Sequence, residues 1–94
     1  MAHYVYVLES VSNGKRYVGS TGQALTERVK QHNRGATSWA KKNGPFRLLY
    51  WEEHPNKTEA LRRERFLKTG IGRRIRDELV RARGGSTEVS SARG

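Results

Sequence analysis

The two-residue alternation of a β-strand occurs twice in the N-terminal part of the chain. Tyr4–Leu8 (YVYVL) and Lys15–Gly19 (KRYVG) are separated by Asn13-Gly14, two residues that tolerate a positive φ. This arrangement predicts a β-hairpin. Because positions two apart share one face of a strand, the tyrosines of the first stretch lie on one face and its valines on the other. Taken alone, the tyrosines are best explained by core packing with their hydroxyls at the rim.

Apolar positions spaced by four predict a helix over residues 23–33, directly after the hairpin. Ser20 begins a capping-box pattern and is the expected N-cap. Arg28 and His32 are also four apart, on a stripe beside the apolar one. Side chains in that position can lie along the sheet while their tips reach solvent.

A third strand is predicted at Phe46–Trp51, from its length and its aromatic and aliphatic composition. Residues 35–44 before it read as a loop or a short irregular helix anchored by Trp39. Leu48 and Leu49 are adjacent and break the alternation of the strand. A central position in the sheet, buried on both faces, would explain that break.

Two further helices are predicted in the second half of the chain. Asn56 is the expected N-cap of a helix over residues 57–69, and Gly70 is its expected left-handed end. A third helix covers residues 72–83 and is rich in arginine. The apolar stripe of the first of these helices contains one carboxylate, Glu64, which is an unusual place for an acid.

The predicted order β-β-α-β-α-α indicates an α/β domain. We expect a small three-stranded sheet, mixed or antiparallel, flanked by helices. Residues 1–83 are expected to form this single domain. Residues 84–94 have no periodicity and the composition of a disordered tail.

The most informative feature of the composition is the net charge. The 94 residues include 19 Lys and Arg against 9 Asp and Glu, a net charge of +10, which favours a polyanionic partner. The absence of cysteine excludes a disulfide scaffold, a thiolate zinc site and a cysteine nucleophile. No signal peptide and no apolar run of membrane-spanning length is visible, so we expect a soluble protein, cytoplasmic if the source is bacterial, with no membrane partner.

Four stretches together resemble the GIY-YIG nuclease family, and in particular its short single-domain branch. Residues 4–6 (YVY) stand where members have Gly-Ile-Tyr, and residues 17–19 (YVG) stand where they have Tyr-Ile-Gly. Residues 28–33 look like the family's arginine helix, and residues 59–68 look like its metal-site helix. Each stretch alone is a weak signal, whereas the ordered set is a strong one.

The resemblance implies a metal-dependent endonuclease acting on DNA. It assigns Glu64 to one divalent cation, Mg²⁺ or Mn²⁺, and Arg28 to the scissile phosphate. Tyr6 or Tyr17 would act as general base or position the water, with both hydroxyls aimed at the phosphate, and Tyr6 is slightly favoured. His32 would orient a water or bind phosphate.

Hydrolysis of a phosphodiester needs these functions, because it requires an activated water, stabilised charge on the phosphorus oxygens and help for the leaving 3′ oxygen. The residues also allow other readings. Glu64 could pair with Lys68 four positions on, Arg28 could be a solvated helix arginine, and His32 could be structural. With no second reading domain, sequence specificity should be low, and a preference for branched, single-stranded or flapped DNA, or for RNA, is left open. The oligomeric state is also left open.

Two positions depart from the family pattern. Tyr4 stands at the glycine of Gly-Ile-Tyr, and Ser20 stands where some relatives have a lysine, for which Lys15 or Lys68 could substitute. Thr37, Ser38 and Trp39 are expected near the substrate groove, with Trp39 equally well explained as core. The basic residues expected to bind the nucleic-acid backbone are Lys15, Arg16, Lys41, Lys42, Lys68, Arg73 and Arg74.

A protein of another class fits the charge as well. It is a non-catalytic basic nucleic-acid-binding or ribosome-associated protein, favoured by the arginine-rich residues 72–83. Pure phosphate binding needs neither an acid in an apolar stripe nor paired tyrosine hydroxyls, which argues against it. A protein-interaction module that places the basic helix on an acidic partner has only the charge in its support.

Overall fold

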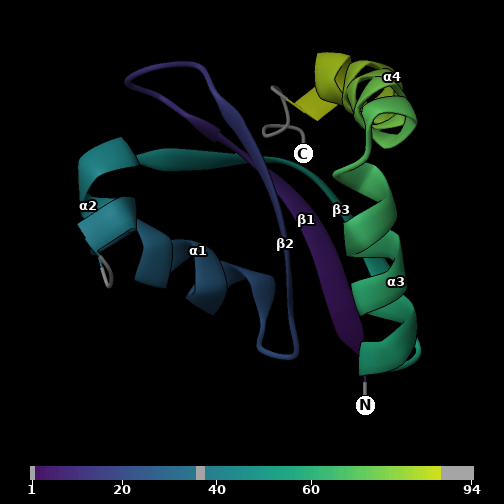
Figure 1. The fold of residues 1–94 in the computed structure, drawn as a ribbon. Helices are drawn as coiled ribbons and strands as arrows, with labels where there is room; N and C mark the ends of the chain where they lie inside the picture. The colour runs from purple at the N-terminus through teal and green to yellow at the C-terminus, as the bar shows by residue number, and fades with distance from the viewer. Residues whose placement is uncertain (1, 36–37, 88–94) are drawn as a thin grey trace.

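Three antiparallel strands form the centre of the computed structural model, which describes residues 2–35 and 38–87 (Figure 1). They are β1 (His3–Ser10), β2 (Arg16–Thr21) and β3 (Phe46–His54), in the spatial order β2-β1-β3. β1 is therefore the central strand, and β2 and β3 form the two edges. The predicted hairpin is confirmed, and Gly14 at its turn takes a φ of +73°.

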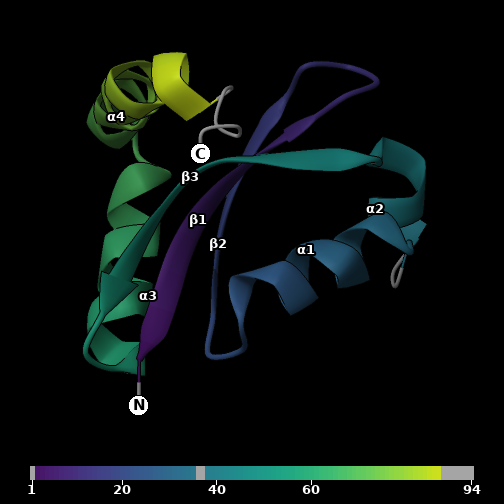
Figure 2. The same ribbon diagram turned by 180° about the vertical axis from the view of Figure 1, so that it is seen from behind.

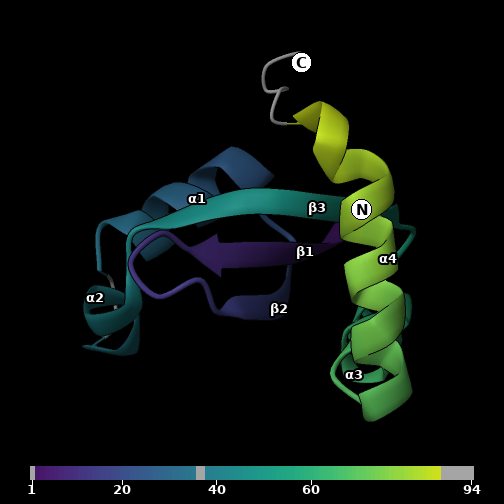
Figure 3. The ribbon, with the colours of Figure 1, turned by 90° about the horizontal axis from the view of Figure 1, so that it is seen from above.

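Helices cover both faces of this sheet. α1 (Leu25–Asn33) and the short α2 (Ser38–Asn43) lie on one side, and α3 (Lys57–Leu67) and α4 (Gly70–Thr87) lie on the other (Figures 1 and 2). Seen from above, α4 and α3 stand together at one side of the sheet (Figure 3). The predicted α/β class and the order β-β-α-β-α-α are confirmed, with α2 as the short helix between α1 and β3.

The alternation in β1 divides the core in two, as the sequence pattern predicted. Tyr6 and Leu8 face α1 and α2, where they pack with Phe46. Val5 and Val7 are fully buried on the opposite face, against α3 and α4. Because β1 is central and helices cover both faces of the sheet, the four consecutive residues Val5–Leu8 are all buried, which explains their apolar character.

The prediction of a central position for the third strand is wrong, because β3 is an edge strand. The adjacent leucines have another cause. The pairing with β1 shifts between Val7↔Tyr50 and Leu8↔Leu48, so Leu49 is an extra residue in the ladder. A bulge of this kind interrupts the two-residue alternation.

The predicted helix ends have mixed outcomes. Asn56 caps α3 as predicted, and its side chain accepts a hydrogen bond from the Glu59 backbone N–H at 2.9 Å. Ser20 does not cap α1, because it lies inside β2, and Ala24 precedes the helix without a side-chain cap. Gly70 is not a left-handed end: it is the first residue of α4, and its φ is not positive.

The C-terminal helix is longer than the sequence indicated. α4 continues to Thr87, past the predicted end at Arg83, so the first four residues of the predicted tail are helical. The remaining residues of that tail, 88–94, lie outside the described residues. Within residues 2–35 and 38–87, no helix has the length and apolarity required to cross a bilayer. The expected cytoplasmic location stays a prediction.

Candidate nuclease site

The Tyr6 hydroxyl is the meeting point of two side chains from α1. Arg28 donates a hydrogen bond from Nε to the Tyr6 oxygen at 3.2 Å, and His32 Nε2 lies 3.4 Å from the same oxygen. Arg28 and His32 are one helical turn apart, so both side chains reach the same point, the Tyr6 hydroxyl. Tyr6 itself is only 4% exposed. The structure thus brings together three of the residues that the sequence singled out.

Gly19 leaves the space that this arrangement needs. It lies opposite Tyr6 in the β1–β2 pairing, and a Cβ atom at residue 19 would lie 2.6 Å from the Tyr6 hydroxyl oxygen. Such a distance is far inside van der Waals contact, so any side chain would displace the tyrosine. The glycine of the Tyr-Val-Gly stretch is therefore required by packing.

Gln31 holds the Arg28 guanidinium from the other side. Arg28 Nη1 donates to Gln31 Oε1 at 3.1 Å, while Nε is directed to Tyr6. The Arg28 side chain is half-buried, and two hydrogen-bond partners fix its guanidinium. Gln31 was not among the predicted site residues, although its spacing of three from Arg28 on a predicted helix was a usable signal.

His32 is neutral at neutral pH. Burial lowers its pKa from 6.5, and the positive charge of Arg28 lowers it further. Its ring meets the Tyr6 ring edge-on, with the centroids 6.1 Å apart. A neutral imidazole whose Nε2 carries no proton accepts a hydrogen bond from the Tyr6 hydroxyl.

Glu64 lies on α3, on the opposite face of the sheet. Its side chain is 17% exposed, and it accepts hydrogen bonds from Ser20 Oγ at 2.7 Å and from Lys68 Nζ at 2.8 Å. Burial by itself would raise the pKa of Glu64, but the hydrogen bonds from Lys68 and Ser20 outweigh it and hold the pKa below 4.5. The carboxylate is therefore ionised at neutral pH. The alternative pairing of Glu64 with Lys68 is present in this structure.

Two consecutive residues of β2 connect these groups. Gly19 faces Tyr6 and the α1 side, whereas Ser20 is directed to Glu64 and the α3 side. β2 is an edge strand, so the two groups lie on either side of a free edge of the sheet.

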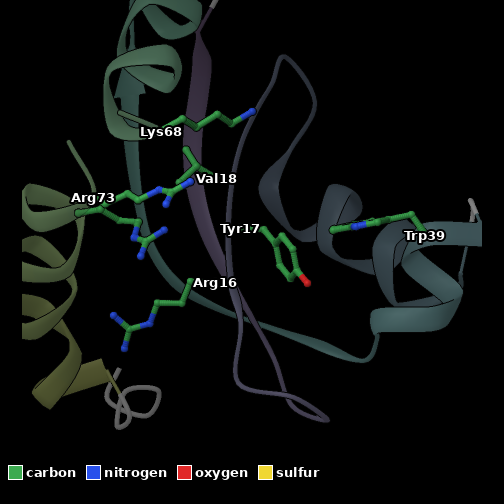
Figure 4. Close-up of a pocket in the computed structure, with 7 residues that line it drawn as sticks. Arg16, Tyr17, Val18, Trp39, Lys68 and Arg73 are labelled. Carbon is green, nitrogen blue, oxygen red and sulfur yellow. The ribbon is translucent and has the colours of Figure 1, made fainter. Parts of the chain in front are cut away.

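Tyr17 takes a different direction from Tyr6. Its hydroxyl donates to Asn43 Oδ1 at 3.3 Å, and its ring packs edge-on against Trp39 at 4.7 Å between centroids. In the close-up its hydroxyl points away from Lys68, the partner of Glu64 (Figure 4). The expectation that both tyrosine hydroxyls aim at one phosphate is therefore not met by Tyr17 in this structure.

A basic pocket of about 370 Å³ opens along β2 (Figure 4). Three of the predicted phosphate-binding residues line it, namely Arg16, Lys68 and Arg73. Arg76 also lines it and was missed, because helix periodicity alone does not tell which arginines of α4 turn toward β2. The other lining residues are Tyr17, Val18 and Trp39. Predicted basic residues that are exposed but do not line this pocket are Lys15, Lys41, Lys42 and Arg74.

The expectation for the residues around Trp39 is partly met. Trp39 lines the pocket, whereas the adjacent Ser38 does not. Thr37 lies outside the described residues.

A cation at Glu64 would have one protein carboxylate. Across residues 2–35 and 38–87 there is no group of three or more His, Cys, Asp or Glu side chains arranged to hold a metal. One ionised, half-buried carboxylate beside a hydroxyl suits Mg²⁺, which keeps most of its waters and takes the remaining ligands from substrate phosphate. The residues present therefore fit a single magnesium ion.

The fold and these side chains define a small α/β domain of nuclease type. The chain belongs to the GIY-YIG family, because the family model described as "GIY-YIG catalytic domain" matches residues 2–75. GIY-YIG nucleases are in general dependent on a divalent metal and act on nucleic acid, which fits the charge of this chain.

The chain is also similar to two UPF0213 proteins over most of its length. UPF0213 protein BH0048 from Halalkalibacterium halodurans is 38% identical over 89 residues, which are 94% of this chain and 92% of that protein. A UPF0213 protein from Staphylococcus aureus is 38% identical over 69 residues, 72% of this chain and 82% of the relative. The solution NMR structure of BH0048 aligns with a TM-score of 0.55, again over 94% of this chain and 92% of that one.

Substitution of Gly19 by alanine tests the packing around Tyr6. We expect Gly19→Ala to displace the tyrosine and to destabilise the protein by about 1–3 kcal/mol, as overpacked sites do. The measurement is urea unfolding together with the NMR shifts of the Tyr6 ring. Gly70→Ala is the matched control, since nothing lies within 4 Å of a Cβ at that position. Equal effects of the two substitutions would contradict the packing argument.

The pH dependence of stability tests the partners of Glu64. Its pKa is lower in the folded protein than in the unfolded chain, so ionised Glu64 stabilises the fold above pH 4.5, and the contribution is lost as the pH falls through the folded pKa. We expect wild type to be more stable than Glu64→Gln at pH 7, with the difference shrinking in acid. Urea midpoints measured between pH 7 and pH 3 would show this. A difference that is constant across this range would mean that Glu64 has no such stabilised charge.

Proposed function

We propose that this protein is an endonuclease that hydrolyses phosphodiester bonds in DNA with the help of one divalent cation and with little sequence specificity. The observation that carries the proposal is the arrangement at the edge of β2. Tyr6, bonded to Arg28, lies opposite Gly19, and the ionised Glu64 is bonded to the next residue, Ser20. These groups cover the requirements for attack of water on a phosphate, which breaks the bond between phosphorus and the 3′ oxygen.

Arg28 binds the phosphate and offsets its charge in the transition state. Its Nη1 donates to Gln31 and its Nε to Tyr6, so the guanidinium is oriented before substrate arrives. Arginine suits this role because its planar fork presents several donors to phosphate oxygens. Pre-orientation matters since the donors then need no rearrangement during the reaction.

Tyr6 is better placed than Tyr17 to take the proton of the attacking water. The Arg28 guanidinium donates a hydrogen bond to its oxygen and holds the phenol in place beside the phosphate that Arg28 would bind. The neutral His32 lies 3.4 Å from the hydroxyl and can receive the phenol proton. Tyr17 instead donates its hydroxyl to the side-chain amide of Asn43 and contacts neither Arg28 nor a proton acceptor such as His32 through that hydroxyl.

Glu64 is the residue that would hold the cation, and Mg²⁺ is preferred over Mn²⁺ because a single carboxylate leaves room for its waters. A bound divalent cation would stabilise negative charge on the phosphate and on the leaving oxygen. The neighbouring Ser20 Oγ donates to the carboxylate and keeps it oriented, while Lys68 Nζ holds its other oxygen. Lys68 is 54% exposed, so a substrate phosphate in solvent can reach its ammonium and replace the carboxylate as its partner.

Non-specific DNA affinity follows from the net charge of +10 and from the basic pocket on β2. Such affinity comes mostly from contacts with the phosphate backbone of DNA, and it decreases steeply as the salt concentration rises. Contacts with the phosphate backbone carry no sequence information, which supports low sequence specificity.

One observation favours the non-catalytic alternative. Both carboxylate oxygens of Glu64 already have partners, in Ser20 and Lys68. A basic nucleic-acid-binding protein could retain this ion pair as a structural contact. The cleavage assay below separates the two possibilities, because only an enzyme loses magnesium-dependent activity when the carboxylate is neutralised.

Cleavage of supercoiled plasmid tests the proposal. We expect nicking by wild type with Mg²⁺ and none with EDTA, and a loss of about 100-fold or more in Glu64→Gln and Arg28→Ala, as for the loss of a group that stabilises transition-state charge. Glu59→Gln is the matched control, since it removes the same charge from the same helix at an exposed position. Wild type and Glu64→Gln with equal nicking would show that the activity is not from this site.

The two tyrosines make opposite predictions. Tyr6→Phe should lower the cleavage rate by about 100-fold or more, the usual contribution of a general base. Tyr17→Phe removes only the bond to Asn43 and should lower the rate by less than about tenfold. Single-turnover rates with Mg²⁺ give this comparison. A larger loss in Tyr17→Phe would assign the proton transfer to Tyr17.

A further inference from the structure

The pocket on β2 has two walls of different chemistry. One is basic and comes from β2, α3 and α4, with Arg16, Lys68, Arg73 and Arg76. The other is aromatic, with Tyr17 from β2 and Trp39 from α2. Figure 4 shows the two walls on opposite sides of β2. A nucleotide has a matching division, because its phosphate is negatively charged and its base is flat and aromatic.

Trp39 combines partial exposure with a fixed aromatic neighbour. Its indole is stacked on Phe46, with an interplanar angle of 15° and 5.4 Å between centroids. Phe46 is 4% exposed, whereas Trp39 is 41% exposed. Tyr17 and His32 meet Trp39 in T-shaped contacts at 86° and 73°, so Phe46 is the ring that lies parallel to the indole.

The short helix that carries Trp39 is fixed to the hairpin. Asn43, the last residue of α2, donates to the Trp39 carbonyl at 2.9 Å and accepts from the Tyr17 hydroxyl. Ser10 Oγ donates to the Asn43 carbonyl at 2.6 Å. The indole is therefore held in position before any ligand arrives, which lowers the entropic cost of binding.

The basic wall contains a cation available to phosphate. Arg16 and Arg76 share Asp77, and Lys68 is paired with Glu64. Arg73 is exposed, and none of the ion pairs found across residues 2–35 and 38–87 includes it. A phosphate on this wall would gain a contact to Arg73 without breaking an existing salt bridge.

Trp51 provides an instructive contrast. It is 40% exposed, almost the same as Trp39. The Arg83 guanidinium lies over its ring at 5.5 Å from the centroid, so a cation already occupies this position on the indole. Trp51 also lies on β3, the opposite edge of the sheet from the basic pocket. Exposure of a tryptophan alone therefore does not make a platform in this protein.

We propose that Trp39 is a stacking platform for an unpaired nucleobase, and that the preferred substrate is therefore single-stranded or locally unpaired nucleic acid. In a duplex both faces of each base are covered by neighbouring base pairs, so only an unstacked base can lie on the indole. Lys68 lines this pocket and also binds Glu64, which puts the platform beside the proposed cleavage centre. That last step, the position relative to the cut, rests on the proposed function.

Binding measured in EDTA tests the platform without cleavage. The probes are fluorescein-labelled dT15 and a 15-base-pair duplex, with rU15 to compare RNA with DNA. We expect Trp39→Ala to weaken dT15 binding about fivefold or more, the effect of one lost base–aromatic stack. Duplex binding should change less than about twofold, and Trp51→Ala should change neither. Equal losses on dT15 and duplex, or no loss on dT15, would overturn the proposal.

Salt dependence separates stacking from charge. Arg73→Gln should reduce the slope of log K against log salt for dT15 by about 0.7, the value for one phosphate contact on a single strand. Trp39→Ala should weaken binding with the slope unchanged. A reduced slope in Trp39→Ala would mean that the substitution disturbs the basic wall instead.

Fluorescence provides a measurement that does not depend on a destabilising substitution. In Trp51→Phe the only tryptophan is Trp39, and we expect its emission to be quenched by dT15 but not by the duplex. Unchanged emission at saturating dT15 would overturn the proposal.

The stacking proposal and the enzymatic proposal can fail separately. If stacking is found and magnesium-dependent nicking is not, only the enzymatic proposal fails. If nicking is found without stacking, the platform fails alone.

Discussion

The candidate site depends on two consecutive residues of one edge strand. Gly19 has no side chain, so the Tyr6 hydroxyl can lie against β2 within reach of Arg28 and His32. Ser20 points to the other face and donates to Glu64 at 2.7 Å. Neighbouring residues in a strand face opposite sides, so this pair links the helices on both faces of the sheet at one point.

Two half-buried carboxylates on the α3 side show what separates a structural acid from a candidate ligand. Glu52 is 14% exposed and accepts hydrogen bonds from Arg63, Tyr50 and His54, so its capacity to accept further hydrogen bonds is used. Its burial is outweighed by these bonds, which keep its pKa low, and burial together with Glu52 raises the pKa of Tyr50 to about 12. Glu64 has only a hydroxyl and one exposed lysine as partners, which leaves it open to exchange.

The sequence predicted those features that depend on local periodicity. The alternation in β1 gave the correct division of Tyr6 from Val5, and the spacing of four placed Arg28 and His32 on one side of α1. Asn56 was identified as a cap because the capping pattern is contained in four residues.

Features that depend on distant contacts were not predicted. Ser20 was taken as a helix cap, yet it pairs with Glu64, which is 44 residues away along the chain. The bulge at Leu49 was read as burial, because a sequence does not show where a ladder slips. The direction of the Tyr17 hydroxyl depends on Asn43, whose position is set by its bonds to the hairpin. Each of these three errors concerns a residue whose partner lies on another element.

In the proposed function, one phosphate is held at the β2 edge by Arg28 from one face of the sheet and by a cation on Glu64 from the other. A crystal structure with Mn²⁺ and a short single-stranded DNA carrying a non-bridging phosphorothioate would test this most directly. We predict one anomalous peak beside Glu64, with Lys68 released from the carboxylate, and a phosphate that contacts both this ion and Arg28. A phosphate bound to Arg28 with Glu64 still paired to Lys68 and no ion beside it would contradict the account.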